Sequence, residues 1–245
     1  MRRRNSRCVY PSRWRRRRSE PNHALTEAVA RRLGPLLPEF VFTGGCATGL
    51  LMTGPASTPP CVTRDVDVIA EVATYGQYSS LGDRLRDAGF LEDGSEGAPI
   101  CRWVSGDLIL DVMPSTNAPL GFTNEWYAAA IPQARWFELA PDLKIRLISG
   151  PLFLATKLVA FQARGNGEYY VSQDMEDIVS VIDGRPELPG LENTDAQARS
   201  FLAERFVALL EDDDFLSWLP GNFPGGASSQ GRVPIVLARI RSIAG

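Results

Sequence analysis

The chain has 245 residues, 44% of them hydrophobic and 22% charged, which is a globular composition and excludes a wholly disordered chain. It contains no apolar run near the roughly 18 residues of a membrane span, and its single histidine, His23, argues against Ser-His-Asp hydrolysis and multi-histidine metal sites. The four cysteines form no C-x-x-C pair, so neither a disulfide scaffold nor a cysteine-based zinc site is indicated. Catalysis must therefore rest on carboxylates, lysine, arginine or backbone groups.

The net charge of −3 conceals an asymmetric distribution. Nine of the 26 basic residues are arginines within residues 1–18, which hold no acid; the other 17, set against 29 acids, leave −12 on residues 19–245. Met1–Pro21 has no hydrophobic periodicity and no apolar segment after its arginines, so it is a poor secretory signal. We expect a cytoplasmic protein with a disordered arginine-rich arm over 1–21; the alternative is an arm that binds nucleic-acid phosphates.

Beyond the arm, apolar residues near helical spacing over 23–37, stopped by Pro38, predict a first helix. Alternation over 65–69 is typical of a half-buried strand, and Ser105-Gly106-Asp107 predicts a hairpin. The predicted helices cover 23–37, 46–52, 77–88, 124–130, 151–164, 173–182, 195–211 and 234–243, and the predicted strands cover 39–43, 65–69, 101–104, 108–113, 135–139 and 143–148. We therefore expect an α/β (α+β) fold, with a mixed-sheet domain over 22–148 and a C-terminal helical region over 149–245.

Gly44 and Gly45 lie between a predicted strand and a predicted helix. Glycines let a phosphate approach the backbone, and the next helix aims its free N–H groups at that point. A glycine pair alone is weak evidence, because it is as often a tight turn.

Three aspartates add weight to this pattern. Asp65 and Asp67 are two residues apart on a strand, so their carboxylates point to the same face and repel each other unless a cation lies between them. Oxygen ligands at this density suit magnesium, although two solvent-facing aspartates would give the same spacing. Asp111 lies in an otherwise apolar strand, where an unpaired carboxylate is costly.

Lys157 interrupts an apolar helix, and Asp174 and Asp177 share one face of the next helix. Lys157 could extend to solvent along the helix or reach a bound triphosphate. Asp174 could cap its helix, whereas Asp177 is the better candidate to orient Lys157 or the acceptor nucleophile.

Taken together, Gly44-Gly45, Asp65-Val66-Asp67 and Asp111 resemble the nucleotidyltransferase superfamily signature, hG[GS] followed by D-h-D and a later D. The segment Leu154–Phe161, then Arg164, then Gln173–Ile178, resembles the AbiEii/MenT branch of toxin-type nucleotidyltransferases. The resemblance covers roughly residues 24–185, and we recognise nothing in 186–245.

The resemblance implies a polymerase-beta-like catalytic domain over 22–148, to which the region 149–245 contributes Lys157 and Asp177. The resemblance implies that Asp65 and Asp67 hold one or two magnesium ions. It also implies that Asp111 completes the second metal site and helps to deprotonate the acceptor. The remaining residues expected to bind the nucleotide are Gly44, Gly45, Arg64, Lys157 and Asp174.

The implied activity is transfer of a nucleotide from an NTP to an RNA, at a tRNA 3′ end, by a toxin with a cognate antitoxin. The alternatives are transfer to a small molecule such as an antibiotic, transfer to a protein side chain, or a nucleotide-binding module without activity.

Overall fold

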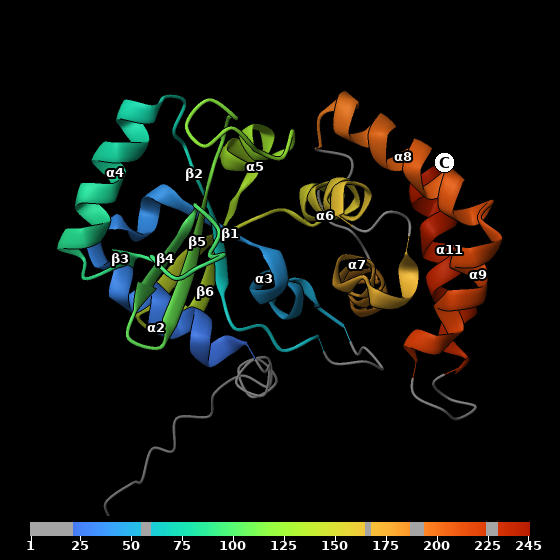
Figure 1. Ribbon diagram of the computed structural model, residues 1–245. Helices are drawn as coiled ribbons and strands as arrows, with labels where there is room; N and C mark the ends of the chain where they lie inside the picture. The colour runs from blue at the N-terminus through green and yellow to red at the C-terminus, as the bar shows by residue number, and fades with distance from the viewer. Residues whose placement is uncertain (1–21, 55–59, 165–167, 187–193, 224–229) are drawn as a thin grey trace, which may run out of the picture.

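The computed structural model describes residues 22–54, 60–164, 168–186, 194–223 and 230–245, so the expected arm over 1–21 lies outside the described residues. Its centre is a seven-stranded mixed sheet with helices packed against it (Figure 1). In order across the sheet, the strands are β3 (Leu91–Glu92), β4 (Arg102–Ser105), β5 (Leu108–Pro114), β2 (Val66–Ala70), β1 (Phe40–Thr43), β7 (Leu143–Leu147) and β6 (Arg135–Ala140). The expected mixed α/β fold is confirmed.

The inner strands pair in both directions. β2 is antiparallel to β1 and parallel to β5, and β1 is also parallel to β7. The hairpin predicted at Ser105-Gly106-Asp107 is confirmed, because β4 and β5 pair antiparallel around it. All four residues of β1 are buried, as expected for a strand in the middle of a sheet that is covered on both faces.

Helices surround the sheet and form the second half of the molecule (Figure 1). The helices are α2 (His23–Leu33), α3 (Gly44–Leu51), α4 (Tyr75–Asp87), α5 (Tyr127–Gln133), α6 (Gly150–Arg164), α7 (Gln173–Gly184), α8 (Ala196–Leu210), α9 (Asp213–Trp218) and α11 (Arg232–Ala244), with 3-10 turns at Gly34–Glu39, Tyr169–Val171 and Leu219–Asn222. The described elements after β7 are all helical, and α6 and α7 lie between the sheet and helices α8 and α11. No helix in the described ranges has both the length and the apolar character needed to cross a bilayer.

Several predicted boundaries were wrong for local reasons. The first helix ends at Leu33 rather than residue 37, because Gly34 has a φ of +52° and a 3-10 turn follows. The helix predicted over 124–130 begins at Tyr127, because the side chain of Asn124 accepts a hydrogen bond from the N–H of Trp126 at 3.1 Å and so forms a turn instead. The helix predicted over 195–211 covers Ala196–Leu210, and a second helix, α9, follows it, capped by the side chain of Asp212.

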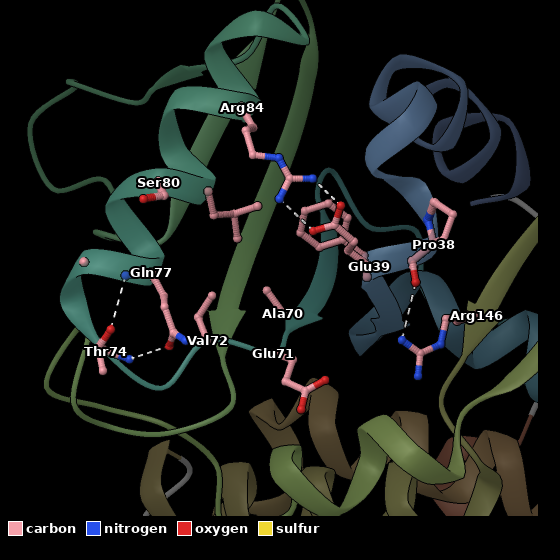
Figure 2. Close-up of a pocket in the computed structure, with 13 residues that line it drawn as sticks. Pro38, Glu39, Ala70, Glu71, Val72, Thr74, Gln77, Ser80, Arg84 and Arg146 are labelled. Atoms are coloured by element: carbon pink, nitrogen blue, oxygen red, sulfur yellow. Dashed lines mark hydrogen bonds and ion pairs between the residues drawn. The ribbon is translucent and has the colours of Figure 1, made fainter.

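A cavity lies at the end of β2 and the start of β1, and Figure 2 shows its lining. Its volume is about 810 Å³. Several of its polar groups pair with one another: Arg84 with Glu39, and Arg146 with the carbonyl of Pro38 at 3.4 Å. None of the predicted site residues lines this cavity.

Candidate active site

Strand register brings the three aspartates together at one end of the sheet. Asp67 of β2 lies opposite Asp111 of parallel β5 on one side and opposite Thr43 of β1 on the other. Asp65 precedes β2 by one residue, and all three aspartates border one cavity of about 330 Å³. The cavity is lined by Thr43, Gly44, Gly45, Thr63, Asp65, Asp67, Pro99, Arg102, Asp111, Met113, Tyr127, Thr156, Lys157, Ala160, Arg164, Gln173 and Asp174.

Gly44 is required by the position of Asp67. It is the first residue of α3, with a φ of +65°, and a Cβ built on it would lie 1.9 Å from Oδ2 of Asp67. A side chain at residue 44 would therefore collide with the carboxylate as well as strain the backbone. The helix was expected to start at Cys46; it starts at Gly44, so Gly44 and Gly45, its first two residues, belong to the cavity wall.

Arg102 occupies the space between two of the aspartates. Its Nε and Nη2 donate to Oδ1 and Oδ2 of Asp111, both at 2.8 Å, and Nη2 also donates to Oδ2 of Asp65 at 2.9 Å. The sequence analysis missed this residue. The signal for it was present, because pairing outward from the Ser105-Gly106-Asp107 turn sets Arg102 opposite Asp111.

Among the residues that the structure describes, Asp67 differs from Asp65 and Asp111 in having no hydrogen-bond or ion-pair partner. Asp65 also accepts a hydrogen bond at Oδ1 from the Thr63 hydroxyl, at 2.6 Å. Within the described residues no hydrogen bond or ion pair reaches the Asp67 carboxylate. Desolvation, followed by the charge of Asp65, raises the pKa of Asp67 to about 7.

A divalent cation fits this donor set through Asp67 and Asp65. Partly buried carboxylates, with room for water and for substrate phosphates, are the environment in which magnesium is usually bound. Among the described residues, however, no group of three acids, cysteines or histidines forms a ready-made metal cluster. Asp111 differs from the other two acids in that Arg102 occupies both of its oxygens.

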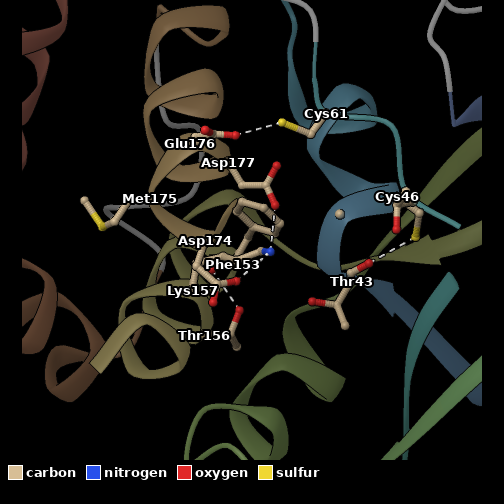
Figure 3. A network of polar contacts seen from close by, with 12 residues as sticks. Thr43, Cys46, Cys61, Phe153, Thr156, Lys157, Asp174, Met175, Glu176 and Asp177 are labelled. Carbon is tan, nitrogen blue, oxygen red and sulfur yellow. Dashed lines mark hydrogen bonds and ion pairs between the residues drawn. The ribbon is translucent and has the colours of Figure 1, made fainter. Parts of the chain in front are cut away.

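Lys157 joins α6 to α7 at the other wall of the cavity, as Figure 3 shows. Its Nζ donates to Oδ2 of Asp177 at 2.7 Å and to Oδ1 of Asp174 at 3.0 Å. Burial alone would lower the pKa of Lys157, but the charges of Asp177 and Asp174 raise it, so the ammonium stays charged. Arg164 donates to Asp174 from the rim at 3.0 Å.

The comparisons with known proteins agree with this architecture. No family model matches the chain, and no curated protein matches it at a significant level. Among solved structures, it is similar to an antigenic nucleotidyltransferase-like protein from Paracoccidioides brasiliensis, at 20% identity and a TM-score of 0.52, over 81% of this chain and 92% of that one. The chain has a nucleotidyltransferase-like fold. JHP933 from Helicobacter pylori is also similar, at 14% identity and a TM-score of 0.47, over 91% of this chain and 90% of that one.

On this nucleotidyltransferase-like fold, most of the predicted site residues share one cavity. Gly44, Gly45, Asp65, Asp67, Asp111, Lys157 and Asp174 all line it. Asp177 does not line it; with 1% of its surface exposed, it lies behind Lys157 and orients it. Arg64 is exposed and is not among the residues that line the cavity, so its expected role at the phosphates stays a prediction. The structure adds two charged residues to the lining, Arg102 and Arg164.

Proposed function

We propose that the protein is a magnesium-dependent nucleotidyltransferase that transfers a nucleotide from an NTP to an acceptor hydroxyl. In this reaction the acceptor hydroxyl loses its proton to solvent and its oxygen forms a bond to the α-phosphorus, while the bond from that phosphorus to the oxygen bridging to the β-phosphorus breaks and pyrophosphate leaves. The observation that carries the proposal is the register that aligns Asp67 with Asp111 at a cavity whose other walls are the start of α3 and Lys157. The nucleotidyltransferase-like fold supports it at the level of the fold.

The residues that line the cavity have different roles in the proposed reaction. Asp65 and Asp67 would hold magnesium, which when bound supplies positive charge to the triphosphate oxygens. Gly44 and Gly45 are the first residues of α3 and line the cavity, and the free N–H groups and dipole of a helix N-terminus would favour an anion there. An ammonium has three donors, and Lys157 gives two of them to Asp174 and Asp177, which leaves the third for a phosphate.

Asp111 fits the role of proton acceptor less well than the family resemblance implied. Both of its oxygens accept hydrogen bonds from Arg102. The planar guanidinium holds this carboxylate in a bidentate pair, and neither oxygen is left without a donor. We therefore assign Asp111 to holding Arg102 and Asp65 in place.

For the acceptor, we propose an RNA, at a tRNA 3′ end, with the protein acting as a toxin that a cognate antitoxin neutralises. This proposal rests on the resemblance of the sequence over 154–178 to the AbiEii/MenT branch. The bound NTP and its metal would lie beside α6 and α7, which carry that segment. The arginines of residues 1–18 would supply positive charge that the rest of the chain lacks.

A second acceptor class, a cationic small molecule such as an antibiotic, is favoured by the charges around the cavity. Four acids line it, against three basic residues. The acids are Asp65, Asp67, Asp111 and Asp174, and the basic residues are Arg102, Lys157 and Arg164. A surplus of carboxylates attracts amines and repels phosphate backbones.

One assay separates these candidates. The purified full chain is incubated with each α-³²P-labelled NTP, magnesium, and either total tRNA or a panel of aminoglycosides, with EDTA as the metal-free control. We expect label on tRNA that depends on magnesium. Label on an aminoglycoside alone would replace the RNA proposal, and no transfer to any acceptor would leave a nucleotide-binding module.

A further inference from the structure

The cavity already contains a cation, because the guanidinium of Arg102 bridges two of the three aspartates. Its three hydrogen bonds, between 2.8 and 2.9 Å, tie Asp111 on β5 to Asp65 ahead of β2. An ordinary cross-strand pair would join Arg102 to Asp111 alone. The additional contact with Asp65 spans from β4 to the segment that enters β2, two strands away in the sheet.

The arginine is held in this position by the fold. Its backbone is fixed opposite Asp111 by the hairpin register, and 22% of its side chain is exposed, against 10% for Asp111. A planar guanidinium matches a carboxylate with two parallel hydrogen bonds, which a compact ammonium cannot do. Arg102 is therefore a fixed part of the site.

The net charge of the three aspartates and Arg102 indicates how many divalent cations the site can hold. Three ionised aspartates carry a charge of −3, and Arg102 reduces it to −2 in a site where charge is poorly screened. Before a nucleotide binds, one divalent cation neutralises the remainder, whereas a second would leave a surplus of +2. With the negatively charged triphosphate present, the limit is set by Asp111, because Arg102 occupies both of its oxygens. Asp67 has no partner among the described residues, and Asp65 keeps unused lone pairs, so these two remain to bind it.

From this we infer, given the proposed function, that Arg102 takes the place of one of two metal ions, so that the site binds a single divalent cation at Asp67 and Asp65. The paired Asp111 then serves to anchor Arg102 and is not a metal ligand. In this arrangement Arg102 is a positioning residue for Asp65 and a permanent positive charge beside the reacting phosphate.

The test is a count of bound metal, which requires no turnover. Free Mn²⁺ is measured by electron paramagnetic resonance while the full chain is titrated, with and without saturating α,β-methylene NTP. We expect one Mn²⁺ per wild-type chain. In Arg102→Gln, which removes the charge and frees Asp111, we expect a second Mn²⁺ or at least tenfold tighter binding of the first.

A matched control is Arg86→Gln. Arg86 also pairs with two carboxylates, those of Asp83 and Glu92, but it lies on α4, away from the cavity. This variant should bind Mn²⁺ as the wild type does. Arg102→Lys, which keeps the charge, should stay at one Mn²⁺ and provides a second variant if Arg102→Gln does not fold.

Three results would overturn the inference: two Mn²⁺ ions bound to the wild-type chain, none bound in either condition, or an Arg102→Gln variant with wild-type number and affinity. The number of bound Mn²⁺ ions tests the role of Arg102 and does not by itself test the proposed nucleotide transfer. A chain that binds one Mn²⁺, gains a second in Arg102→Gln and transfers no nucleotide would support the role of Arg102 and reject the transferase.

Discussion

Gly44 leaves open the space that the Asp67 carboxylate fills, and this single contact links the start of α3 to the aspartates. The structure combines a positive φ with a close approach at this residue. Gly106 has a similar φ, +60°, but no atom lies within 4 Å of the Cβ that would be added there. The two glycines therefore allow strain and collision to be measured apart.

Gly106→Ala should cost only the backbone strain, about 1–2 kcal/mol of unfolding free energy. Gly44→Ala should cost more than that and should also impair nucleotide transfer, because Asp67 must move. Urea unfolding of both variants, with activity assays alongside, measures the difference. Equal losses of stability and activity in the two variants would show that the collision is relieved at no cost.

Asp67→Asn tests the unpaired carboxylate. Transfer should fall by about a thousandfold or more, as for other groups that stabilise charge in the transition state. The metal-free variant should be at least as thermally stable as the wild type at pH 8, because a desolvated charge without a partner has been removed. The control is Asp107→Asn, an exposed aspartate in the nearby hairpin turn. Substantial activity in Asp67→Asn would reject the metal assignment.

Cys61 should be unreactive at neutral pH. Burial raises the pKa of its thiol to about 12, and the Glu176 carboxylate, which accepts its hydrogen bond at 3.0 Å, adds to the shift. Below that pKa, each pH unit lowers the thiolate fraction tenfold, so alkylation by iodoacetamide at pH 8 should be at least about tenfold slower than for a free cysteine peptide. Glu176→Gln should speed it by lowering the pKa. Peptide mass spectrometry of Cys61 follows the rate, and an unchanged rate in Glu176→Gln would contradict the contact.

At the level of whole elements, the site depends on how α6 and α7 are fastened together and to the rest of the chain. The last turn of α7 is capped from α11, where Arg239 donates to the carbonyls of Ile182 and Asp183 at 2.7 and 2.6 Å. Cations at a helix C-terminus satisfy its free carbonyls and its dipole. The C-terminal helices, which carry no recognised motif, therefore support the helix that orients Lys157.

Lys157 should prove structural as well as functional. Lys157→Met would leave Asp177 charged and unpaired where only 1% of its surface is exposed, so we expect a loss of about 3–5 kcal/mol of unfolding free energy. The double variant Lys157→Met/Asp177→Asn should regain most of that stability, because the buried charge is removed. If Lys157 also contacts phosphate, the double variant should still turn over slowly. Wild-type kinetics in the double variant would show that Lys157 has a structural role and does not contact the phosphate.

At the level of the whole molecule, the distribution of charge bears on the acceptor. Residues 19–245 carry a net charge of −12, so a protein that binds RNA must concentrate its basic residues, and residues 1–18 are the densest basic segment of the sequence. The three aspartates and Lys157 all lie outside that segment. Binding and chemistry can therefore be separated by deletion.

Deleting residues 1–18 should leave transfer at saturating tRNA unchanged. If the arginines contact RNA, affinity should fall and its dependence on salt should flatten, because fewer counterions are released on binding. The measurement is tRNA affinity against salt concentration for both lengths of the chain. Identical affinity at every salt concentration would assign the arm no part in RNA binding, and slower transfer at saturating tRNA would place part of the catalytic machinery within it.

Much of the fold followed from local patterns in the sequence. Alternation predicted β2, the turn residues predicted the β4–β5 hairpin, and apolar spacing predicted the start of α2 at His23. These signals are reliable because side-chain direction within an element depends only on its period. The same reasoning selected Asp65, Asp67 and Asp111, since carboxylates in apolar strands require a partner.

Tertiary structure decided what those residues contact. That Asp67 lies opposite Asp111, and that Arg102 joins Asp111 to Asp65, depends on which strands become neighbours, because pairings between distant strands are set by packing and not by local spacing. For the same reason Asp177 was found behind Lys157 and Arg64 outside the cavity, although both were near the right motifs in sequence. Residue spacing identified the acids, and the packing of strands and helices determined which of them are left free to bind a cation.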